Sequence, residues 1–138
     1  MKYSERSGTQ NQTGALGERL AARYLTERGL TVVEMNVTRS YGEIDIVARG
    51  TSGRLHFVEV KTLSYDSREL LEAAVQARHY NPEDHVDERK IKQLKRVAQA
   101  WLSPNTEQVE WQIDVLAIRI VPREKYASVN YLENVTGS

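Results

Sequence analysis

The sequence predicts an α/β fold in which helices flank a mixed central sheet. Its patterns follow in the order of one helical segment, three strand-like segments, a long helical region and a further strand. A run of strands followed by a helical crossover to another strand is typical of such a sheet. The 138 residues are about one domain's worth, and 40% hydrophobic and 28% charged side chains are ordinary proportions for a globular chain.

The opening helix is expected over residues 14–28. Thr13 precedes it as a candidate N-cap, and Gly29 follows it as a helix-ending glycine. Large apolar or aromatic side chains recur within it at helical spacing, at Leu16, Leu20 and Tyr24. Residues 1–12 are polar and are expected to be a flexible tail. The domain is therefore expected to begin at residue 13.

Three strands are expected next, over residues 30–37, 43–49 and 55–62. A polar turn at 38–42 separates the first two, and a glycine-bounded loop at 50–53 makes a hairpin of the second and third. The third strand is the most apolar, which indicates a central position in the sheet.

The remainder of the domain is expected to be helical up to a last strand. Residues 68–78 and 87–102 are interpreted as two helices and residues 109–121 as the strand. The basic side chains of the second helix lie largely off its apolar stripe, which comprises Ile91, Leu94, Ala98, Trp101 and Leu102. One domain over 13–121 follows, with a C-terminal extension, 122–138, whose structure the pattern does not define.

Composition and motifs exclude several classes of protein. The chain has no cysteine, which rules out disulfides, thiolate zinc sites and cysteine nucleophiles. It has no G-x-x-x-x-G-K-[ST] loop and no G-x-S-x-G motif, which disfavours P-loop nucleotide hydrolases and serine esterases. No apolar run approaches the roughly 20 residues that cross a bilayer, and no secretory signal is visible, so a cytoplasmic protein without membrane contact is expected. The 19 basic and 19 acidic residues balance, so any basic surface must be local.

Charged residues interrupt two strands where apolar side chains are expected. Glu59 and Lys61 lie within the apolar third strand, and the period of two puts both on one face. The same period separates the side chains of the preceding strand into one face with Ile44, Ile46 and Ala48 and another with Glu43, Asp45 and Val47. If the two strands form a hairpin, the carboxylates of Asp45 and Glu59 meet at one end of the sheet.

A third carboxylate, on the first helix, fits the same picture. Glu18 falls at the edge of the apolar stripe among small residues, from where it can point toward the sheet. Carboxylates held together repel one another unless a cation neutralises them. Oxygen ligands without cysteine or clustered histidine suit Mg²⁺ or Mn²⁺, and a lysine beside such an ion suits phosphate chemistry. The alternative is an ordinary ion pair between Glu59 and Lys61 on a solvated face.

The ordered set Glu18, Asp45 and Glu59-Val60-Lys61 resembles the PD-(D/E)xK nuclease superfamily. The chain is more closely similar to the YraN-like family of small bacterial proteins predicted to be endonuclease-related. The similarity covers residues 14–121 and rests on GALGERLAARYLTERGL (14–30), the asparagine of EMN (34–36), GEIDIVARG (42–50), LHFVEVKTLS (55–64), KIKQLKRVAQAWL (90–102) and IDVLAI (113–118). It implies a restriction-endonuclease-like fold.

The resemblance also implies a role for each matching residue. The implied metal ligands are Asp45, Glu59, the backbone carbonyl of Val60 and, directly or through water, Glu18. Lys61 would position the attacking water, and Glu43 would assist beside the metal. The expected reaction is hydrolysis of DNA phosphodiester bonds in repair or recombination. Archaeal-type Holliday-junction resolvases share the order of these residues, so branched DNA is a candidate substrate.

Basic and aromatic residues around the expected site can form a groove for nucleic acid. They are Arg19, Arg39, Tyr41 and Arg49 near the carboxylates, and Lys90, Lys92, Lys95 and Arg96 on the helix 87–102. Each phosphate contact would add salt-dependent affinity, and the alternative for the helix is a solvated face. Trp101 and Trp111 are expected in the core, and His56 is expected to point away from Glu59.

Three functions remain open at this point. The first is a metal-dependent DNA endonuclease, the second a nucleic-acid-binding module that keeps the fold without cleaving, and the third a structural partner in a larger complex. The intact acidic and basic positions argue against the second, and zero net charge argues against strong nonspecific binding. A homodimer would suit an enzyme that cuts two strands, because that takes two sites.

Overall fold

The computed structural model describes residues 1–4, 13–77, 86–102 and 108–136. Its helices and strands are α1 (Thr13–Glu27), β1 (Thr31–Arg39), β2 (Gly42–Arg49), β3 (Leu55–Ser64), α2 (Arg68–Ala77), α3 (Glu88–Leu102), β4 (Trp111–Val121), the 3-10 helix η3 (Pro122–Glu124) and β5 (Tyr126–Leu132). The helices and strands expected from the sequence are therefore present, with ends that differ by a few residues.

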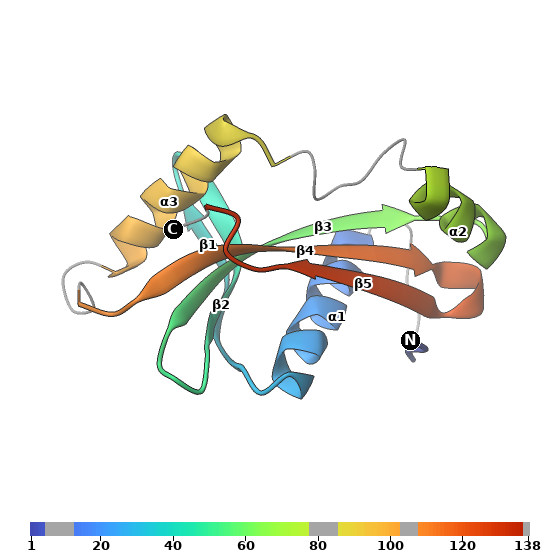
Figure 1. Ribbon diagram of the computed structural model, residues 1–138, viewed down its shortest axis with the longest axis horizontal. Helices are drawn as coiled ribbons and strands as arrows, with labels where there is room; N and C mark the ends of the chain where they lie inside the picture. Colours follow the sequence, from blue (N-terminus) through green and yellow to red (C-terminus); the bar gives the residue numbers. More distant parts are fainter. Residues whose placement is uncertain (5–12, 78–85, 103–107, 137–138) are drawn as a thin grey trace.

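The strands form one sheet in the order β1-β2-β3-β4-β5. β3 and β4 pair in parallel, and the other neighbours pair antiparallel. The connection between β3 and β4 includes α2 and α3, and Figure 1 shows α1 and α3 on opposite sides of the sheet. The prediction of a mixed α/β sheet flanked by helices is confirmed. None of the described helices is long and apolar enough to span a lipid bilayer.

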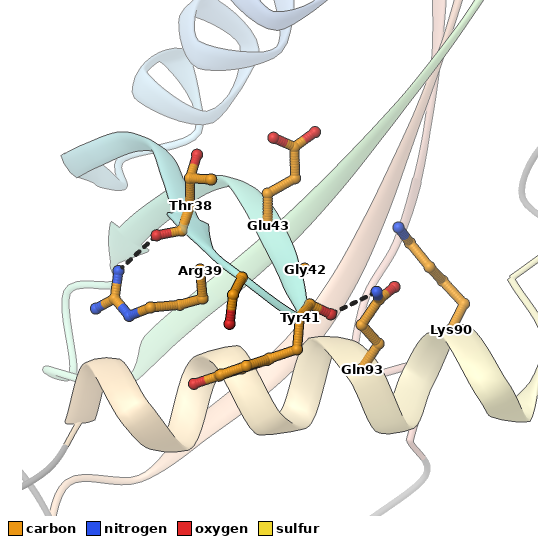
Figure 2. A pocket seen from close by; sticks show the side chains of 8 residues that line it. Thr38, Arg39, Tyr41, Gly42, Glu43, Lys90 and Gln93 are labelled. Atoms are coloured by element: carbon orange, nitrogen blue, oxygen red, sulfur yellow. Dashed lines mark hydrogen bonds between the residues drawn. The ribbon is translucent and has the colours of Figure 1, made fainter.

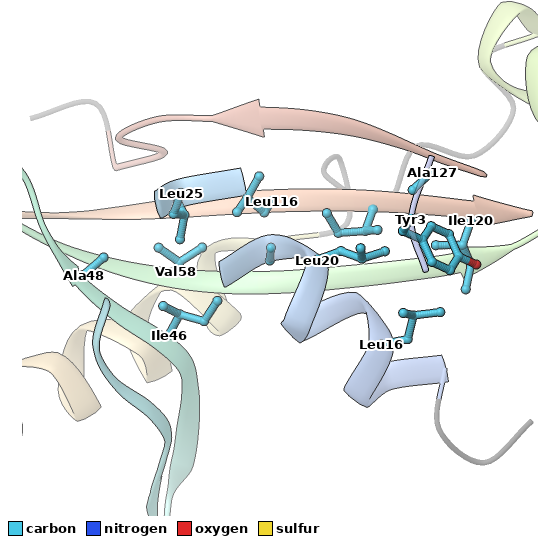
Figure 3. Close-up of a cluster of buried hydrophobic side chains, with 12 residues drawn as sticks. Tyr3, Leu16, Leu20, Leu25, Ile46, Ala48, Val58, Leu116, Ile120 and Ala127 are labelled. Carbon is cyan, nitrogen blue, oxygen red and sulfur yellow. The ribbon is translucent and has the colours of Figure 1, made fainter. Parts of the chain in front are cut away.

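The core under α1 depends on large side chains at helical spacing. Leu16, Leu20 and Leu25 are buried and pack on the sheet residues Val58 and Leu116, among others (Figure 3). Burying a leucine side chain contributes about 1.5–3 kcal/mol, so this face fixes α1 against β3 and β4.

The core under α3 is built in the same way on the other face. Leu94 and Val97 of α3 pack with Phe57 of β3, whose ring contacts Trp101 and Trp111 edge-on, with centroids 5.7 Å apart in both cases. Both tryptophans are partly buried in this cluster, as expected. Glu59 and Lys61 share the face of Phe57 by the period of two, so they point toward the side of the sheet that carries α3.

Both ends of the chain differ from the expectation. Residues 122–138 were not assigned an element, yet β5 forms the edge of the sheet beside β4. Residues 1–4 were expected in a flexible tail, but Lys2 forms a bridge with Tyr126 and Tyr3 is buried in the core under α1. Each segment gains backbone hydrogen bonds from the other, which a reading of local periodicity does not detect. The rest of the expected tail, 5–12, lies outside the described residues.

A buried polar network ties β3, β4 and the C-terminal segment together. Asp114 is fully buried and accepts hydrogen bonds from Tyr131, from Gln112 at 2.7 Å and from the backbone amide of Asn134 at 2.8 Å. Its Oδ2 also lies 2.7 Å from Nδ1 of His56. Burial alone would raise the pKa of Asp114, but these hydrogen bonds outweigh it and hold the pKa below the ordinary value.

Replacing this carboxylate is expected to destabilise the fold. Asp114→Asn should lower the free energy of unfolding at pH 7 by about 2–4 kcal/mol, because the donors lose a charged acceptor. A group with a lowered pKa stabilises the fold above its unfolded pKa, and that contribution disappears as the pH falls through its folded pKa. In urea denaturation the gap between wild type and variant should therefore shrink from pH 7 to pH 3. Equal stability at pH 7 would contradict this role.

Candidate functional site

The pairing between β2 and β3 ends where the two strand carboxylates lie. The paired residues run from Arg49 and Leu55 to Ile46 and Val58, and the next position along each strand is Asp45 or Glu59. The backbone amide of Val60 donates a hydrogen bond of 2.7 Å to Oδ2 of Asp45. A side chain thus takes the place of a strand partner, and the two strands form a fork with a carboxylate on each arm.

The chain changes faces at this fork. Ile46 packs in the cluster under α1, whereas Ile44 packs in the cluster under α3, so the expected placement of both on one face is wrong. Beyond Ile46, β2 pairs with β1 but not with β3. On β1, Asn36 adopts the left-handed φ of 57° between the residues that pair with Ile46 and Ile44. Asparagine tolerates this conformation better than most residues, and the turn of the strands lets Asp45 face Glu59.

Asp45 and Glu59 are held together out of solvent. Their exposed fractions are 8% and 7%. Burial, followed by the charge of Glu59, raises the pKa of Asp45 to about 7, although the hydrogen bond from Val60 opposes the shift. The Asp45 carboxyl therefore resists ionisation beside Glu59, and a bound cation would remove that resistance.

Glu59 has one oxygen with an ion-pair partner but no hydrogen bond. Its Oε2 atom is buried and has no hydrogen bond. Nζ of Lys90, on α3, approaches that atom at 3.3 Å, and the two side chains are 9% and 29% exposed. Lys90 therefore supplies charge to this oxygen without satisfying its hydrogen-bonding capacity, and a cation that replaced Lys90 could bind there.

Glu18 approaches the same fork from α1. Burial first, then the charges of Glu43 and Glu59, raise the pKa of Glu18. Its neighbour Gly17 allows the approach, because a Cβ there would lie 1.9 Å from Oγ1 of Thr62. Thr62 follows Lys61 on β3, so the close contact brings the start of α1 to the end of the fork.

This contact gives a prediction for Gly17. A methyl group at position 17 would also lie 2.9 Å from Cβ and Cγ2 of Thr62, so rotating the threonine cannot relieve the clash. Gly17→Ala should therefore destabilise the fold by about 1–3 kcal/mol through overpacking. Gly14→Ala, which meets nothing within 4 Å, is the matched control and should be neutral or slightly stabilising. Equal melting temperatures for the two variants would show that α1 does not depend on this contact.

The acidic residues do not form a complete metal cage by themselves. Among the described residues no three histidine, cysteine, aspartate or glutamate side chains are grouped closely enough to hold a metal ion. Asp45 and Glu59 meet, and Glu18 stands further out, where its charge acts on Asp45 and the charge of Glu43 acts on Glu18 in turn. The buried Glu59 oxygen without a hydrogen bond and the oxygen-only donor set fit Mg²⁺ or Mn²⁺, which keep several waters as ligands. Ligation by Glu18 through water and by the Val60 carbonyl stays a prediction.

Lys61 follows Glu59 on the same strand face. It is partly exposed, and none of the ion pairs found among the described residues engages it. His56, three residues before Glu59, bonds to Asp114 instead and lies on the opposite face by the period of two, as expected. Lys61 is therefore a lysine beside the two carboxylates that can reach a bound ligand.

A hollow of about 550 Å³ lies beside the fork, between the β1–β2 turn and α3. Figure 2 shows Lys90 and Gln93 rising from α3 toward the turn. Gln93 donates a hydrogen bond of 2.6 Å to the carbonyl of Tyr41, and Arg39 lines the hollow with Glu43 and Lys90. The guanidinium of Arg96 lies 3.9 Å from the centre of the Tyr41 ring. Arg39, Tyr41 and Lys90 thus line one space, and Arg96 lies next to it against the Tyr41 ring.

The other candidate nucleic-acid residues do not join this space. Arg49 lies at the far end of β2, paired with Leu55, and Arg19 contacts the Ser4 carbonyl at 3.5 Å. Lys95 lines a separate hollow with Arg54, and Lys92 is exposed. The candidate nucleic-acid-binding residues therefore lie at several separate places on the surface and do not form one continuous basic face.

The position of Lys90 corrects the sequence interpretation of α3. The basic side chains were expected largely off its apolar stripe, but Lys90 turns toward the sheet and reaches Glu59. Leu94 and Val97, both buried, follow it by four and seven residues, which is the spacing of one helix face. This spacing to two buried residues is the sequence signal that could have placed Lys90 on the face of α3 that meets the sheet.

The sequence of the chain matches a known family. The model of UPF0102, an uncharacterised protein family, matches residues 17–118. This chain belongs to that family. UPF0102 proteins of Mycobacterium tuberculosis and Mycobacterium avium are 38% and 34% identical to it; the first alignment covers 83% of each chain, and the second covers 96% of this chain and 95% of the relative. The resemblance to the YraN-like proteins is thereby confirmed, and the matched region contains Glu18, Asp45, Glu59 and Lys61.

Two solved structures align with most of this chain at low sequence identity. A repair endonuclease from Pyrococcus abyssi aligns with a TM-score of 0.39 and 11% identity, over 80% of this chain and 39% of that one. An EndoMS–dsDNA2 complex aligns with a TM-score of 0.37 and 15% identity, over 82% and 38% of the two chains. This chain spans about two fifths of the length of either protein.

Proposed function

We propose that this UPF0102 protein is a metal-dependent endonuclease that hydrolyses DNA phosphodiester bonds in repair or recombination, with branched DNA among its substrates. The observation that carries the proposal is the pair of buried carboxylates at the fork, Asp45 with its raised pKa and Glu59 with an oxygen that has only the ion pair with Lys90, followed on β3 by Lys61. A protein without a ligand for this fork would gain stability by replacing Asp45 with a residue that cannot ionise, because burial beside Glu59 raises the pKa of Asp45.

The residues divide the chemistry between them. Asp45 and Glu59 hold Mg²⁺ or Mn²⁺, with the Val60 carbonyl and, through water, Glu18 completing the set, and Glu43 adds negative charge nearby. When bound, such an ion polarises the phosphoryl oxygen and lowers the pKa of its water. Lys61 orients the attacking water and stabilises the charge that develops on the phosphorane.

The DNA strand is proposed to lie in the hollow between the β1–β2 turn and α3. Arg39 and Arg96 offer charge for phosphates, and Tyr41 offers a ring for a base or sugar. Because only part of the basic surface faces this space, the affinity should depend on few phosphate contacts. Such a surface suits recognition of DNA shape better than tight nonspecific binding.

A cleavage assay with four DNA structures tests the proposal. Purified protein is incubated with labelled single-stranded, duplex, flap and four-way-junction DNA in Mg²⁺, in Mn²⁺ and in EDTA. A double variant, Asp45→Asn with Glu59→Gln, purified in parallel, controls for contaminating nucleases. Cleavage that requires metal and is lost in the double variant supports the endonuclease, and the four rates rank its substrates.

The other outcomes separate the remaining functions. Gel shifts on these DNAs without cleavage in either metal would favour the non-cleaving binding module. Neither cleavage nor a shift would leave a structural partner in a larger complex as the better explanation.

A further inference from the structure

Lys90 supplies a positive charge to the fork in the metal-free protein. Its Nζ lies 3.3 Å from the Glu59 oxygen that has no hydrogen bond. On the other arm of the fork, Oδ2 of Asp45 already accepts a hydrogen bond from the Val60 amide, so Oε2 of Glu59 is the buried fork oxygen that a cation would take. Lys90 and a bound metal ion therefore require the same carboxylate oxygen.

The backbone of α3 fixes where the Lys90 side chain starts, so its approach to Glu59 is not a chance contact of a surface side chain. Gln93, one turn further along α3, donates to the carbonyl of Tyr41 at 2.6 Å and so joins the helix to the β1–β2 turn. The fit at this point is close, since a Cβ on Gly42 would lie 2.7 Å from Cγ of Gln93. The start of α3 is thus fixed over the fork, while the long lysine side chain keeps its own rotational freedom.

The hollow beside the fork offers Lys90 a second position. Lys90 lines this space together with Arg39, and Figure 2 shows its side chain at the border of the hollow. A lysine that leaves Glu59 can therefore turn toward a DNA phosphate without movement of the backbone. In that position it faces the strand path instead of the carboxylates.

We propose that Lys90 is a built-in counter-ion that a divalent cation displaces from Glu59, and that the released ammonium group then binds the DNA backbone. This inference rests on the proposed metal-dependent function and adds a coupling between the two ligands. Metal binding frees a phosphate-binding lysine, so DNA is held more tightly once the metal is in place. By linkage, DNA strengthens metal binding by the same factor.

The test measures metal affinity without any cleavage. Mn²⁺ is titrated calorimetrically into wild type, Lys90→Met, Lys92→Met and Asp45→Asn. Lys90→Met should bind Mn²⁺ about tenfold more tightly than wild type, because the ion no longer competes with a positive charge. Lys92→Met removes the same charge from an exposed position of the same helix and should match wild type. Asp45→Asn should lose the binding and so assign the heat to the fork.

A second measurement addresses the released lysine. The affinity for DNA is measured in EDTA and in Ca²⁺. Adding Ca²⁺ should raise the affinity of wild type, and the factor by which it raises the affinity of Lys90→Met should be smaller, by about threefold or more. An unchanged or weaker Mn²⁺ affinity in Lys90→Met, with normal binding by wild type, would overturn the displacement while the metal site stands. Absence of Mn²⁺ binding by both proteins would overturn the metal site itself, and with it the proposed function. An unchanged gain on adding Ca²⁺ would overturn the phosphate-binding role.

Discussion

Lys61→Ala should reduce metal-dependent DNA cleavage by about 10²–10⁴-fold and leave the fold intact. Removing one group that stabilises developing charge or orients the nucleophile typically costs this much. No ion pair found among the described residues uses Lys61, so its loss breaks no contact of that kind. Single-turnover cleavage rates in Mg²⁺ and a thermal melt of both proteins measure the two effects separately.

The control for Lys61 is a cation far from the fork. Arg123, exposed in η3, carries the same charge at the turn between β4 and β5. Arg123→Ala should keep the cleavage rate within about twofold of wild type, since exposed charges that far away are screened. Cleavage by Lys61→Ala at the wild-type rate would remove the lysine from the mechanism.

Asp45→Asn should abolish cleavage and at the same time stabilise the metal-free protein at pH 8. In the folded protein the pKa of Asp45 is raised from 3.8 to about 7. The folded state therefore binds its proton more tightly than the unfolded chain, and stability falls as the pH rises from about 4 to about 7. The asparagine cannot ionise, and it can still accept the hydrogen bond from Val60. We expect a gain of about 1–3 kcal/mol at pH 8 and none near pH 4.

Chemical denaturation in EDTA at the two pH values measures this effect. Glu110→Gln is a suitable control, because Glu110 is an exposed acid whose pair with Arg54 lies away from the fork. It should change stability by no more than about 0.5 kcal/mol at either pH. A metal-free Asp45→Asn protein less stable than wild type at pH 8 would show that the carboxylates do not strain the fold.

The elements that the sequence predicts have clear local patterns. The N-terminal pairing that it does not predict depends on contacts with a distant part of the chain. The period of α1 and the apolar run of β3 identify those elements without any partner. Lys2 pairs with Tyr126 of β5 across more than a hundred residues of chain, so the sequence around residue 2 carries little signal of its partner. β5 forms a hairpin with β4, which directly precedes it, but the sequence interpretation assigned no element after residue 121. Their hydrogen bonds become visible only once the sheet exists.

The sequence predicts the candidate site residues on the strands better than those on the helices. Asp45, Glu59 and Lys61 stand out because charge interrupts apolar strands. The change of face at Ile44 could not be derived, because it depends on where β2 stops pairing with β3. Lys90 was treated as one cation of a basic helix, although its spacing to buried Leu94 places it over the fork.

The most direct measurement on the fork is anomalous diffraction from crystals soaked in Mn²⁺ at a concentration that supports cleavage. We expect one strong anomalous peak bounded by the carboxylates of Asp45 and Glu59, with Lys90 turned away from Glu59. The same soak of Asp45→Asn crystals should show no peak there. A protein that cleaves DNA while its fork stays free of Mn²⁺, with the ion bound elsewhere, would contradict the assignment of this site.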